Sequence, residues 1–327
     1  MSKYLDNPVF LCGHRKSGTT MLINLFDNAF EAITYPDDSG FFYKYFPEYE
    51  LEKYSDQEKI ERLCSTIAGE KLTEVISNID ISANDKKELF QNQKDFIHKI
   101  RGYSKSNFNY KDILLHFIES FRESFYEGRD AKVWIEKTTT TELYALELAN
   151  KFPNAKFIHI VRDPRDNWAS LLSGWDERYK NFNDSKEELL QSMIERGRLG
   201  MEFAKHNLTV LGNDRYKVIR FEDLTSNPEY WMKDLSNFIG IEFNENLLTP
   251  TVFGHPWYGN NFDGVRKLKP SSENVSKWSS RISQKDAKII EFYFSDIMDH
   301  FQYEKSYSLK DTQLAAAEHY KWFNFSL

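Results

Sequence analysis

Basic and hydroxyl side chains gather in one short loop near the start of the chain. The apolar run from Pro8 to Leu11 is typical of a buried strand. The loop that follows it reads Gly13-His14-Arg15-Lys16-Ser17-Gly18-Thr19-Thr20. Apolar residues at helical spacing come next, so we expect a strand, a tight turn and a helix in that order. Free backbone N–H groups and the positive end of the helix dipole would meet at this turn, which favours phosphate binding.

The loop differs from the nucleoside-triphosphate motif G-x-x-x-x-G-K-[ST] at one decisive position. Gly13 and Gly18 have the required separation, but Thr19 stands where the motif has its lysine. The cations come before the second glycine instead, at Arg15 and Lys16. Such a loop is poorly equipped to grip β- and γ-phosphates with Mg²⁺, but it suits one terminal phosphate. A glycine-containing turn that binds no ligand is the alternative interpretation.

Two further cations follow predicted strands. Lys137 comes just after the apolar run 131–135, and Arg162 comes directly after the run 156–161. In parallel sheets, ligands bind at the carboxyl ends of the strands, so we expect Arg15, Lys137 and Arg162 to meet at that edge. The structural alternatives are a solvated lysine at the end of a strand and an arginine that pairs with a nearby aspartate.

The order of the predicted elements indicates the fold class. Strands alternate with helices, which favours an α/β fold with a parallel, doubly wound sheet flanked by helices. Residues 44 to about 128 are mostly charged and helical, and we expect them to form an insertion that covers the site. The remaining segment of note is a helical tail at about 306–327. We expect residues 1–327 to form a single domain.

Composition narrows the classes of partner. The net charge is −7 and the sequence pI is about 5.7, which argues against a nucleic-acid partner. Cys12 and Cys64 are the only cysteines, and zinc-ligand spacing is absent, so we expect free thiols and no metal site. We find neither a run of membrane-spanning length nor a signal-peptide pattern, which predicts a cytoplasmic protein. The oligomeric state stays open, a homo-oligomer included.

These motifs, in this order, resemble those of the sulfotransferase superfamily, which uses 3′-phosphoadenosine 5′-phosphosulfate (PAPS). The loop 15–20 resembles the 5′-phosphosulfate motif, and Arg162-Asp163-Pro164 with Ser170 resembles the 3′-phosphate motif. Between them, Glu136-Lys137-Thr138 resembles the lysine motif. Lys269 and Trp278 lie in stretches similar to the loop that closes over the nucleotide. The resemblance spans residue 8 to about 300, apart from the insertion, and implies a P-loop-like sulfotransferase fold.

The resemblance implies a sulfotransferase that moves the sulfuryl group of PAPS to a hydroxyl or an amine by metal-free, in-line displacement. The acceptor would be a small molecule, a lipid or a natural-product intermediate. Lys137 would contact the oxygen that bridges phosphate and sulfate, and Arg15 or Lys16 would contact the equatorial oxygens. Ser17, Gly18, Thr19 and Thr20 would complete the 5′ side of the cofactor site.

The other end of the nucleotide is assigned to a second set of residues. Arg162 and Ser170 supply a guanidinium fork and a hydroxyl, which suit the 3′-phosphate dianion. Phe221 and Trp278 are expected near the adenine, although core packing is a strong alternative for Phe221. Lys269 is expected in the loop that covers the nucleotide.

A general base is still needed to accept the proton of the acceptor. Some relatives place a histidine directly after the lysine-threonine pair, but threonines occupy those positions here. Other relatives use a carboxylate about nineteen residues beyond the first loop threonine, followed by two aromatic residues, and Asp38 occupies that position. Asp38 is our first candidate and Asp37 the second, with two solvated turn aspartates as the alternative. Glu136 is interpreted as the partner of a cation.

Two other functions compete with this prediction. The first is a P-loop nucleotide kinase or another NTPase, which would require Mg²⁺ and which the missing loop lysine disfavours. The second is a catalytically inactive scaffold that binds the nucleotide and engages a protein through its insertion. Neither alternative explains the ordered set of Lys137, Arg162 with Ser170, and the stretch around Trp278.

Overall fold

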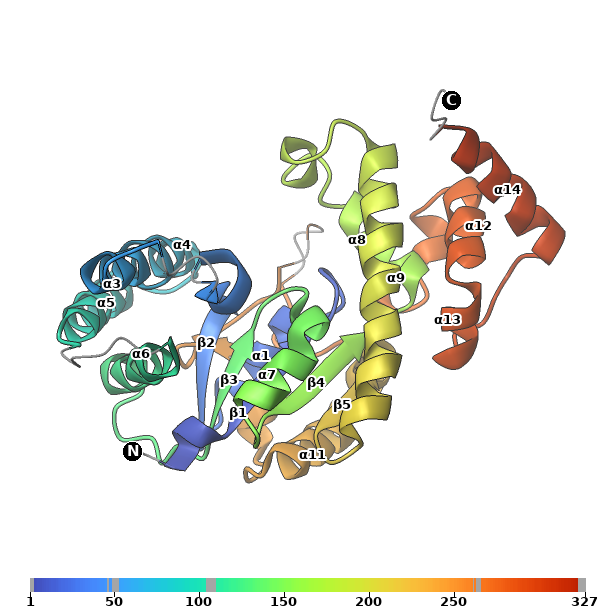
Figure 1. Cartoon of the computed structure of the whole chain (residues 1–327). Helices are drawn as coiled ribbons and strands as arrows, with labels where there is room; N and C mark the ends of the chain where they lie inside the picture. Colours follow the sequence, from blue (N-terminus) through green and yellow to red (C-terminus); the bar gives the residue numbers. More distant parts are fainter. Residues whose placement is uncertain are drawn as a thin grey trace.

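The computed structural model describes residues 3–45, 47–48, 53–103, 110–260, 262 and 266–322. A five-stranded parallel sheet lies at its centre, with the strand order β2-β3-β1-β4-β5 (Figure 1). The strands are β1 (Pro8–Cys12), β2 (Ala32–Asp38), β3 (Val133–Lys137), β4 (Lys156–Val161) and β5 (Tyr216–Arg220). The predicted α/β class with a parallel sheet is confirmed.

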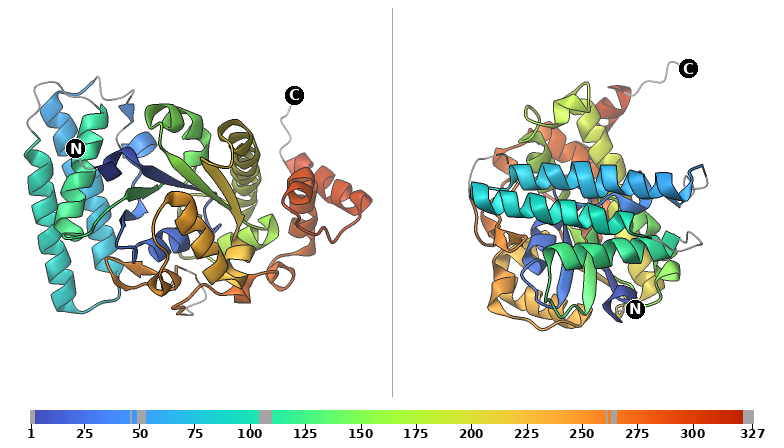
Figure 2. Two further views of the ribbon diagram at one scale, coloured as in Figure 1. Left: turned by 90° about the horizontal axis from the view of Figure 1, so that it is seen from below. Right: turned by 90° about the vertical axis from the view of Figure 1, so that its left-hand side faces the viewer.

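Helices cover both faces of the sheet (Figure 2). The central strand β1 shows why, because Phe10 and Cys12 pack into one face while Val9 and Leu11 pack into the other, and all four are buried. One face is covered by α1 (Thr19–Phe26), α10 (Phe221–Ser226) and α11 (Pro228–Ile239). The other is covered by α6 (Tyr110–Phe125), α7 (Ala145–Lys151) and α9 (Lys186–Leu211).

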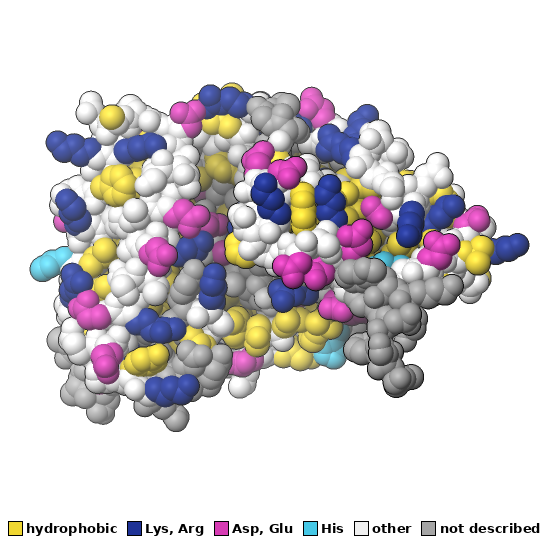
Figure 3. Space-filling model, turned by 90° about the horizontal axis from the view of Figure 1, so that it is seen from above, with side chains coloured by type: hydrophobic (Ala, Val, Ile, Leu, Met, Phe, Trp, Pro, Cys, Tyr) yellow, Lys and Arg dark blue, Asp and Glu magenta, His cyan; other side chains and the backbone are white. Residues whose placement is uncertain are grey.

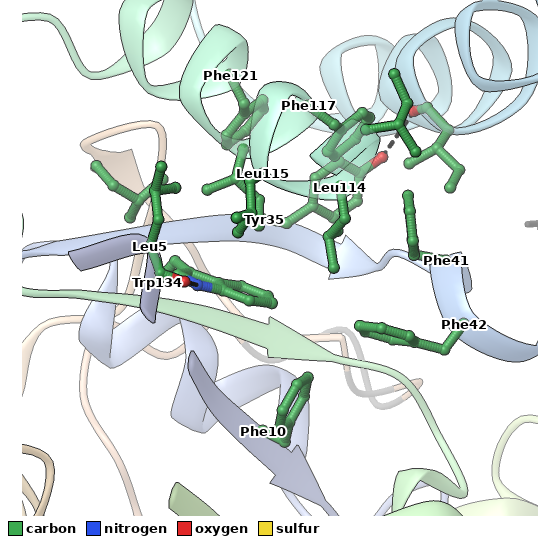
Figure 4. Close-up of a cluster of buried hydrophobic side chains, with 14 of the residues drawn as sticks. Leu5, Phe10, Tyr35, Phe41, Phe42, Leu114, Leu115, Phe117, Phe121 and Trp134 are labelled. Carbon is green, nitrogen blue, oxygen red and sulfur yellow. Dashed lines mark hydrogen bonds between the residues drawn. The ribbon is translucent and has the colours of Figure 1, made fainter. Parts of the chain in front are cut away.

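The predicted insertion lies between β2 and β3 in the chain and beside the edge strand β2 in space (Figure 2). It contains α3 (Asp56–Ser65), the π-helical turn η3 (Thr66–Lys71), α4 (Leu72–Asn78), α5 (Ala83–Arg101) and α6. Ser55 caps α3 in a capping box with Glu58. Buried side chains of α6 pack around Tyr35 of β2 and Trp134 of β3, so the insertion and the sheet share one hydrophobic core (Figure 4).

A C-terminal group of helices packs at the opposite end of the sheet (Figure 1). It comprises α8 (Pro164–Leu172), part of α9, α12 (Gln284–Tyr293), α13 (Ser295–His300) and α14 (Leu309–Trp322). The predicted tail at 306–327 forms α14, which packs on α12, and residues 323–327 lie outside the described part. Buried Glu291 accepts the backbone N–H groups of Ser306 and Tyr307 and fixes the start of this tail.

Short elements connect these layers. They are η1 (Lys3–Asp6), η2 (Phe41–Tyr45), η4 (Thr141–Tyr144), η5 (Tyr179–Asn181), η6 (Glu245–Leu248), β6 (Thr251–Val252), β7 (His255–Pro256), η7 (Ser272–Asn274) and η8 (Trp278–Ser280). The carboxylate of Asp27, at the end of α1, accepts the Thr251 hydroxyl at 2.7 Å and the Gly254 N–H at 2.8 Å. This contact fastens the β6–β7 hairpin to the C-terminal end of α1.

Candidate active site

Two glycines shape the loop between β1 and α1. Gly13 and Gly18 have φ angles of 142° and 109°, which side chains rarely tolerate. A Cβ on Gly18 would lie 2.6 Å from the ring of Phe221, and one on Gly13 would lie 2.6 Å from the Ile160 carbonyl oxygen. The loop therefore packs directly against β4 and α10. Because Gly18 precedes the first helical residue, Thr19, the N-terminus of α1 opens at this edge of the sheet.

We expect Gly18→Ala to destabilise the protein by about 1–3 kcal/mol, since it adds backbone strain and a clash with Phe221. Urea unfolding measures this effect. The matched control is Gly128→Ala, because Gly128 also has a positive φ, of 82°, but a Cβ there meets nothing within 4 Å. Equal losses at the two sites would show that the backbone angle alone matters and that the contact with Phe221 does not.

A cavity of about 610 Å³ opens beside this loop, and we call it the nucleotide pocket. Its basic lining residues are Lys16, Arg162, Lys186, Lys267, Lys269 and Arg281. Among the described residues, no aspartate or glutamate lines it. The face shown in Figure 3 carries basic and acidic side chains intermixed, whereas the charged side chains that line the pocket are basic. A pocket of this kind selects an anionic ligand of nucleotide size.

The structure brings most of the predicted nucleotide contacts into this pocket. The predicted residues that line it are Lys16, Gly18, Thr19, Thr20, Arg162, Ser170, Phe221 and Lys269. Trp257 and Phe262 add apolar surface from the segment after the β6–β7 hairpin. Cations, hydroxyls and aromatic faces together suit the phosphates and the base of a nucleotide.

Arg162 is held in place with part of its guanidinium unused. Its Nη1 donates to the carbonyl oxygen of Lys16 at 2.8 Å, and its guanidinium carbon lies 4.4 Å from the centroid of the Phe221 ring. Its Nε is buried and has no hydrogen-bond acceptor in the described part of the chain. A buried donor without a partner is costly, so an anion bound beside Ser170 would satisfy it.

Three predicted nucleotide contacts have side chains that do not line the pocket. Arg15 donates to the Ser192 hydroxyl of α9 at 2.9 Å, Ser17 donates to the His14 carbonyl at 2.6 Å, and Trp278 packs under the Arg165 guanidinium. The positive φ of Lys16, 66°, turns the loop so that Arg15 and Lys16 point in different directions. The nucleotide contacts proposed for these three side chains stay predictions, which this arrangement does not support.

Lys137 forms the second part of the site with two carboxylates and a hydroxyl. Its Nζ lies 2.9 Å from Asp38 Oδ1 and 3.6 Å from Asp37 Oδ1, and it donates to the Thr20 hydroxyl at 3.0 Å. Lys71 of the insertion lies 3.2 Å from Asp37 Oδ2. We call Lys71, Asp37, Asp38 and Lys137 the lysine–aspartate cluster. Thr20 links this cluster to the nucleotide pocket because it also lines that pocket.

An irregularity of β2 brings both aspartates to the same lysine. Neighbouring side chains on a regular strand point to opposite faces. The register between β2 and β3 shifts between Thr34 and Asp38, around Pro36, which lies on an edge strand where a missing N–H is tolerated. The chain therefore bends at Asp37 and Asp38, and both carboxylates approach Lys137.

The charges of the cluster support one another. The side chain of Lys137 is only 3% exposed, and burial lowers its pKa, but Asp38 and Asp37 outweigh that effect and raise the pKa of Lys137 above its usual value. Burial likewise acts to raise the pKa of Asp37, but Lys137 and Lys71 outweigh it, so the pKa of Asp37 is lowered. Lys137 is therefore an ammonium at neutral pH, directly behind the wall of the nucleotide pocket.

Among the described residues, Glu136 makes no direct ion pair, and the charge of Lys137 acts on it only weakly. Its side chain points to the opposite face from Lys137 and accepts the hydroxyls of Ser39 and Thr138. Burial is the main reason that its pKa rises to about 7, although these hydroxyls lower it. The N–H of Gly40 donates to the Thr138 hydroxyl at 3.0 Å, so these residues fix the turn that follows Asp38.

Sequence reasoning missed the pocket cations Lys186, Lys267 and Arg281. It also missed two residues beside Lys137. Lys71 gave no signal because it lies in a long, charged helical segment, and Thr139 was treated only as a replacement for a histidine. The Thr139 hydroxyl donates to Asp38 Oδ2 at 3.1 Å and so orients that carboxylate. A hydroxyl two residues after a strand-end lysine is a signal that could have been used for Thr139.

The described residues contain neither a metal-binding cluster nor a helix suited to span a membrane. In that part of the chain, no group of three His, Cys, Asp or Glu side chains is arranged to hold a metal ion. No helix within the described ranges combines the length and the apolar character needed to cross a membrane.

Curated relatives share part of this chain. A protein-tyrosine sulfotransferase of Drosophila melanogaster is 28% identical over 136 residues, which are 41% of this chain and 25% of that protein. A carbohydrate sulfotransferase 3 of Mus musculus is 26% identical over 167 residues, which are 46% of this chain and 34% of that protein. The matches thus span about a quarter to a third of the length of these relatives.

Solved structures share the fold over most of the chain. The sulfotransferase domain of the Synechococcus PCC 7002 olefin synthase has a TM-score of 0.55 at 18% identity and covers 91% of this chain and 95% of that domain. The sulfotransferase domain from the curacin biosynthetic pathway has a TM-score of 0.57 at 16% identity, with coverage of 91% and 98%. At these identities the likeness establishes the fold.

The match to the family model decides the assignment. The model of the sulfotransferase family matches residues 8–245, which contain the loop after β1, Lys137, Arg162 and Ser170. It covers more than half of the chain and confirms the superfamily that the order of the motifs predicts. The chain therefore belongs to the sulfotransferase family.

Proposed function

We propose that this sulfotransferase transfers the sulfuryl group of PAPS to a hydroxyl or an amine of a small-molecule or lipid acceptor. Family membership supplies the class of reaction and its donor, PAPS. The observation that carries the proposal is the position of Lys137, a buried ammonium bound to Thr20 at the wall of a cation-lined pocket. That position supplies positive charge where a leaving group develops negative charge.

The pocket residues fit PAPS at both ends. Arg162 and Ser170 line one part of the pocket, and the unused Nε of Arg162 suits a 3′-phosphate. Lys16, Gly18 and Thr19 line another part, where an ammonium group and the N-terminus of α1 suit a phosphosulfate. Phe221, Trp257 and Phe262 line the pocket, and their aromatic surface suits the adenine.

The protein groups act by position and charge. PAPS supplies the sulfur, which forms a bond to the acceptor atom as its bond to the bridging oxygen of the 5′-phosphate breaks. Lys137 stabilises the charge on that oxygen, and Lys16 stabilises the oxygens around the sulfur. A sulfuryl group carries less charge than a phosphoryl group, so we propose that lysine and arginine side chains take the place that Mg²⁺ has in nucleotide kinases.

Asp38 is the proposed general base. Its side chain is about one-third exposed, and it contacts the Lys137 ammonium and the Thr139 hydroxyl. Lys137 is also the group that would stabilise the leaving nucleotide. When Lys137 turns to the leaving oxygen, the Asp38 carboxylate is released to accept the proton of the acceptor. Asp37, which holds a second ammonium from Lys71, is less suited to this step.

We expect Asp38→Asn to lower turnover by roughly 10²-fold, because the amide cannot accept the proton. Asp37→Asn should have a smaller effect, and neither change should weaken binding of the product 3′-phosphoadenosine 5′-phosphate (PAP) more than a few-fold. Steady-state rates and calorimetric titration of PAP test this. A larger loss of turnover in Asp37→Asn than in Asp38→Asn would exchange the two roles.

The function is tested first by ligand-induced thermal stabilisation. A ligand that binds the native state raises the melting temperature. We expect PAP in the presence of EDTA to stabilise the protein more than ATP with Mg²⁺ does at the same concentration. The reverse result would favour the nucleotide kinase.

Transfer itself is tested with ³⁵S-labelled PAPS and a panel of acceptors. The panel contains small alcohols, phenols, amines and lipid alcohols, with a tyrosine peptide and a carbohydrate added because the named relatives are tyrosine and carbohydrate sulfotransferases. Labelled product with a small molecule or a lipid supports the proposal, and product with the peptide or carbohydrate alone would replace the acceptor class. PAP binding without transfer to any acceptor would favour the inactive scaffold.

A further inference from the structure

The helical insertion contains a π-helical turn, η3, between α3 and α4. Gly69 lies within it, and a Cβ there would be 2.5 Å from the Cys64 carbonyl oxygen, so the turn accepts no larger residue without moving. π-Helical turns inside α-helices are rare and are frequent at functional sites. The extra residue of such a turn changes the side of the helix on which the next side chains emerge.

The carbonyl groups of this turn are held by two buried side chains. The Tyr35 hydroxyl of β2 donates to the Ile67 carbonyl at 2.8 Å, and Tyr35 lies in the aromatic core beneath α6 (Figure 4). Gln93 of α5 donates to the carbonyls of Ala68 and Gly69 at 2.8 Å each. The turn is therefore fixed to the same strand that carries Asp37, two residues beyond Tyr35.

Lys71 is the last residue of the turn and reaches the lysine–aspartate cluster. Its Nζ lies 3.2 Å from Asp37 Oδ2, while Lys137 Nζ lies 3.6 Å from the other oxygen of the same carboxylate. The Lys71 side chain is 17% exposed, so it makes this ion pair in a largely enclosed place. Asp37 thus lies between two ammonium groups, and Asp38 contacts Lys137 and Thr139.

We propose that Lys71 is a positioning residue of the active site, which holds Asp37 as a carboxylate and leaves Lys137 and Asp38 available for the reaction. The role rests on the proposed sulfuryl transfer. This role would make the insertion part of the active site, because its π-helical turn η3 carries Lys71, one of the four charged residues of the lysine–aspartate cluster.

The charge balance explains why a second lysine matters. Asp37 faces Lys71 from the insertion and Lys137 from β3, and its carboxylate also accepts a backbone hydrogen bond from Asp38. Besides burial, the Asp38 carboxylate helps to raise the pKa of Glu136. With Lys71 present, two ammonium groups serve two carboxylates. Without it, both carboxylates would depend on Lys137 alone, and Asp37 would lose one of the two ammonium groups that lower its pKa. Lys137 would then be held back from the leaving oxygen.

The test compares Lys71→Met and Lys71→Arg with a matched control, Lys99→Met. Lys99 lies in the same insertion and pairs with Glu123 at 2.8 Å, away from the cluster. In the free protein, ¹³C NMR of labelled aspartate carboxyl groups follows the titration of Asp37, with assignment by Asp37→Asn. In the active protein, the pH dependence of kcat/KM is measured for each variant.

We expect Lys71→Met to raise the titration midpoint of Asp37 by about one pH unit or more and to move the acid limb of kcat/KM in the same direction. KM for PAPS should change little because Lys71 does not line the nucleotide pocket. Lys71→Arg should restore both pH dependences, and Lys99→Met should leave both as in the wild type.

An unchanged midpoint of Asp37 in Lys71→Met would overturn the proposal. A moved midpoint with an unchanged acid limb would also overturn it, because the ion pair would then serve only to dock the insertion. Failure of the wild-type protein to transfer sulfate to any acceptor would count against the proposed function alone. The carboxyl titration needs neither donor nor acceptor and still decides whether Lys71 holds Asp37 ionised.

Discussion

Lys137→Met is expected to lower turnover by about 10³-fold while PAP still binds, because one preorganised charge at a leaving group is worth about that much. The Lys137 ammonium lies behind the wall of the nucleotide pocket, where it donates to Thr20, and it supplies charge mainly when the leaving oxygen becomes negative. Methionine keeps the length and apolar character of the side chain, so the buried stem is still filled. Single-turnover rates with saturating PAPS measure the chemical step directly.

The control for this experiment is Lys132→Met. Lys132 lies just before the same strand and pairs with Glu31, with its side chain 52% exposed. Its replacement should leave turnover within about two-fold, since exposed ion pairs contribute little. If Lys137→Met kept more than a tenth of the wild-type rate, or lost PAP binding to the same degree as turnover, the role in the transition state would be wrong.

Arg162→Ala is expected to weaken PAP binding by about 10²- to 10³-fold, which is the usual loss when one partner of a buried charge pair is removed. Binding of adenosine 5′-phosphate, which lacks the 3′-phosphate, should weaken far less. This difference is expected because the Arg162 guanidinium is fixed by the Lys16 carbonyl and the Phe221 ring, while its buried Nε has no acceptor among the described residues. A 3′-phosphate would supply that acceptor. Calorimetric titration of both nucleotides gives the ratio.

Ser170→Ala separates the loss of the contact from damage to the pocket. Ser170 lines the pocket on α8, and its replacement removes a hydroxyl without disturbing a buried charge. We expect Ser170→Ala to weaken the binding of PAP by about 10-fold and to weaken the binding of adenosine 5′-phosphate much less. The assignment of the 3′-phosphate would fail if both variants weakened the two nucleotides equally at an unchanged melting temperature.

Most of the sheet could be predicted from the sequence because the strands are short apolar runs between clear turn signals. The run at β4, Lys156–Val161, ends directly at Arg162, and parallel topology then places Arg162 at the same edge as the loop after β1. The run 8–11 likewise ends at the glycine-containing loop that follows β1, so the position of that loop could be predicted as well. Predictions based on local chemistry of this kind were confirmed.

The side-chain directions at the site could not be predicted in the same way. Arg15 and Lys16 are neighbours in sequence, but the left-handed backbone at Lys16 sends Arg15 to α9 and Lys16 to the pocket. The shift in register at Pro36 brings two adjacent aspartates to one lysine, and no periodicity indicates such a shift. Lys71 meets Asp37 only through the packing of the insertion, which depends on contacts between residues far apart in the chain.

The common core of the insertion and the sheet also limits how such enzymes can be recombined. Phe117 and Phe121 of α6 pack against Tyr35 of β2, and Tyr35 in turn holds the turn that carries Lys71. A chimaera that received the insertion of another sulfotransferase would therefore need matching residues on β2 and β3 as well. Exchange of the insertion alone would leave both the core and the lysine–aspartate cluster incomplete, so the insertion and the strand beside it would have to be transferred together.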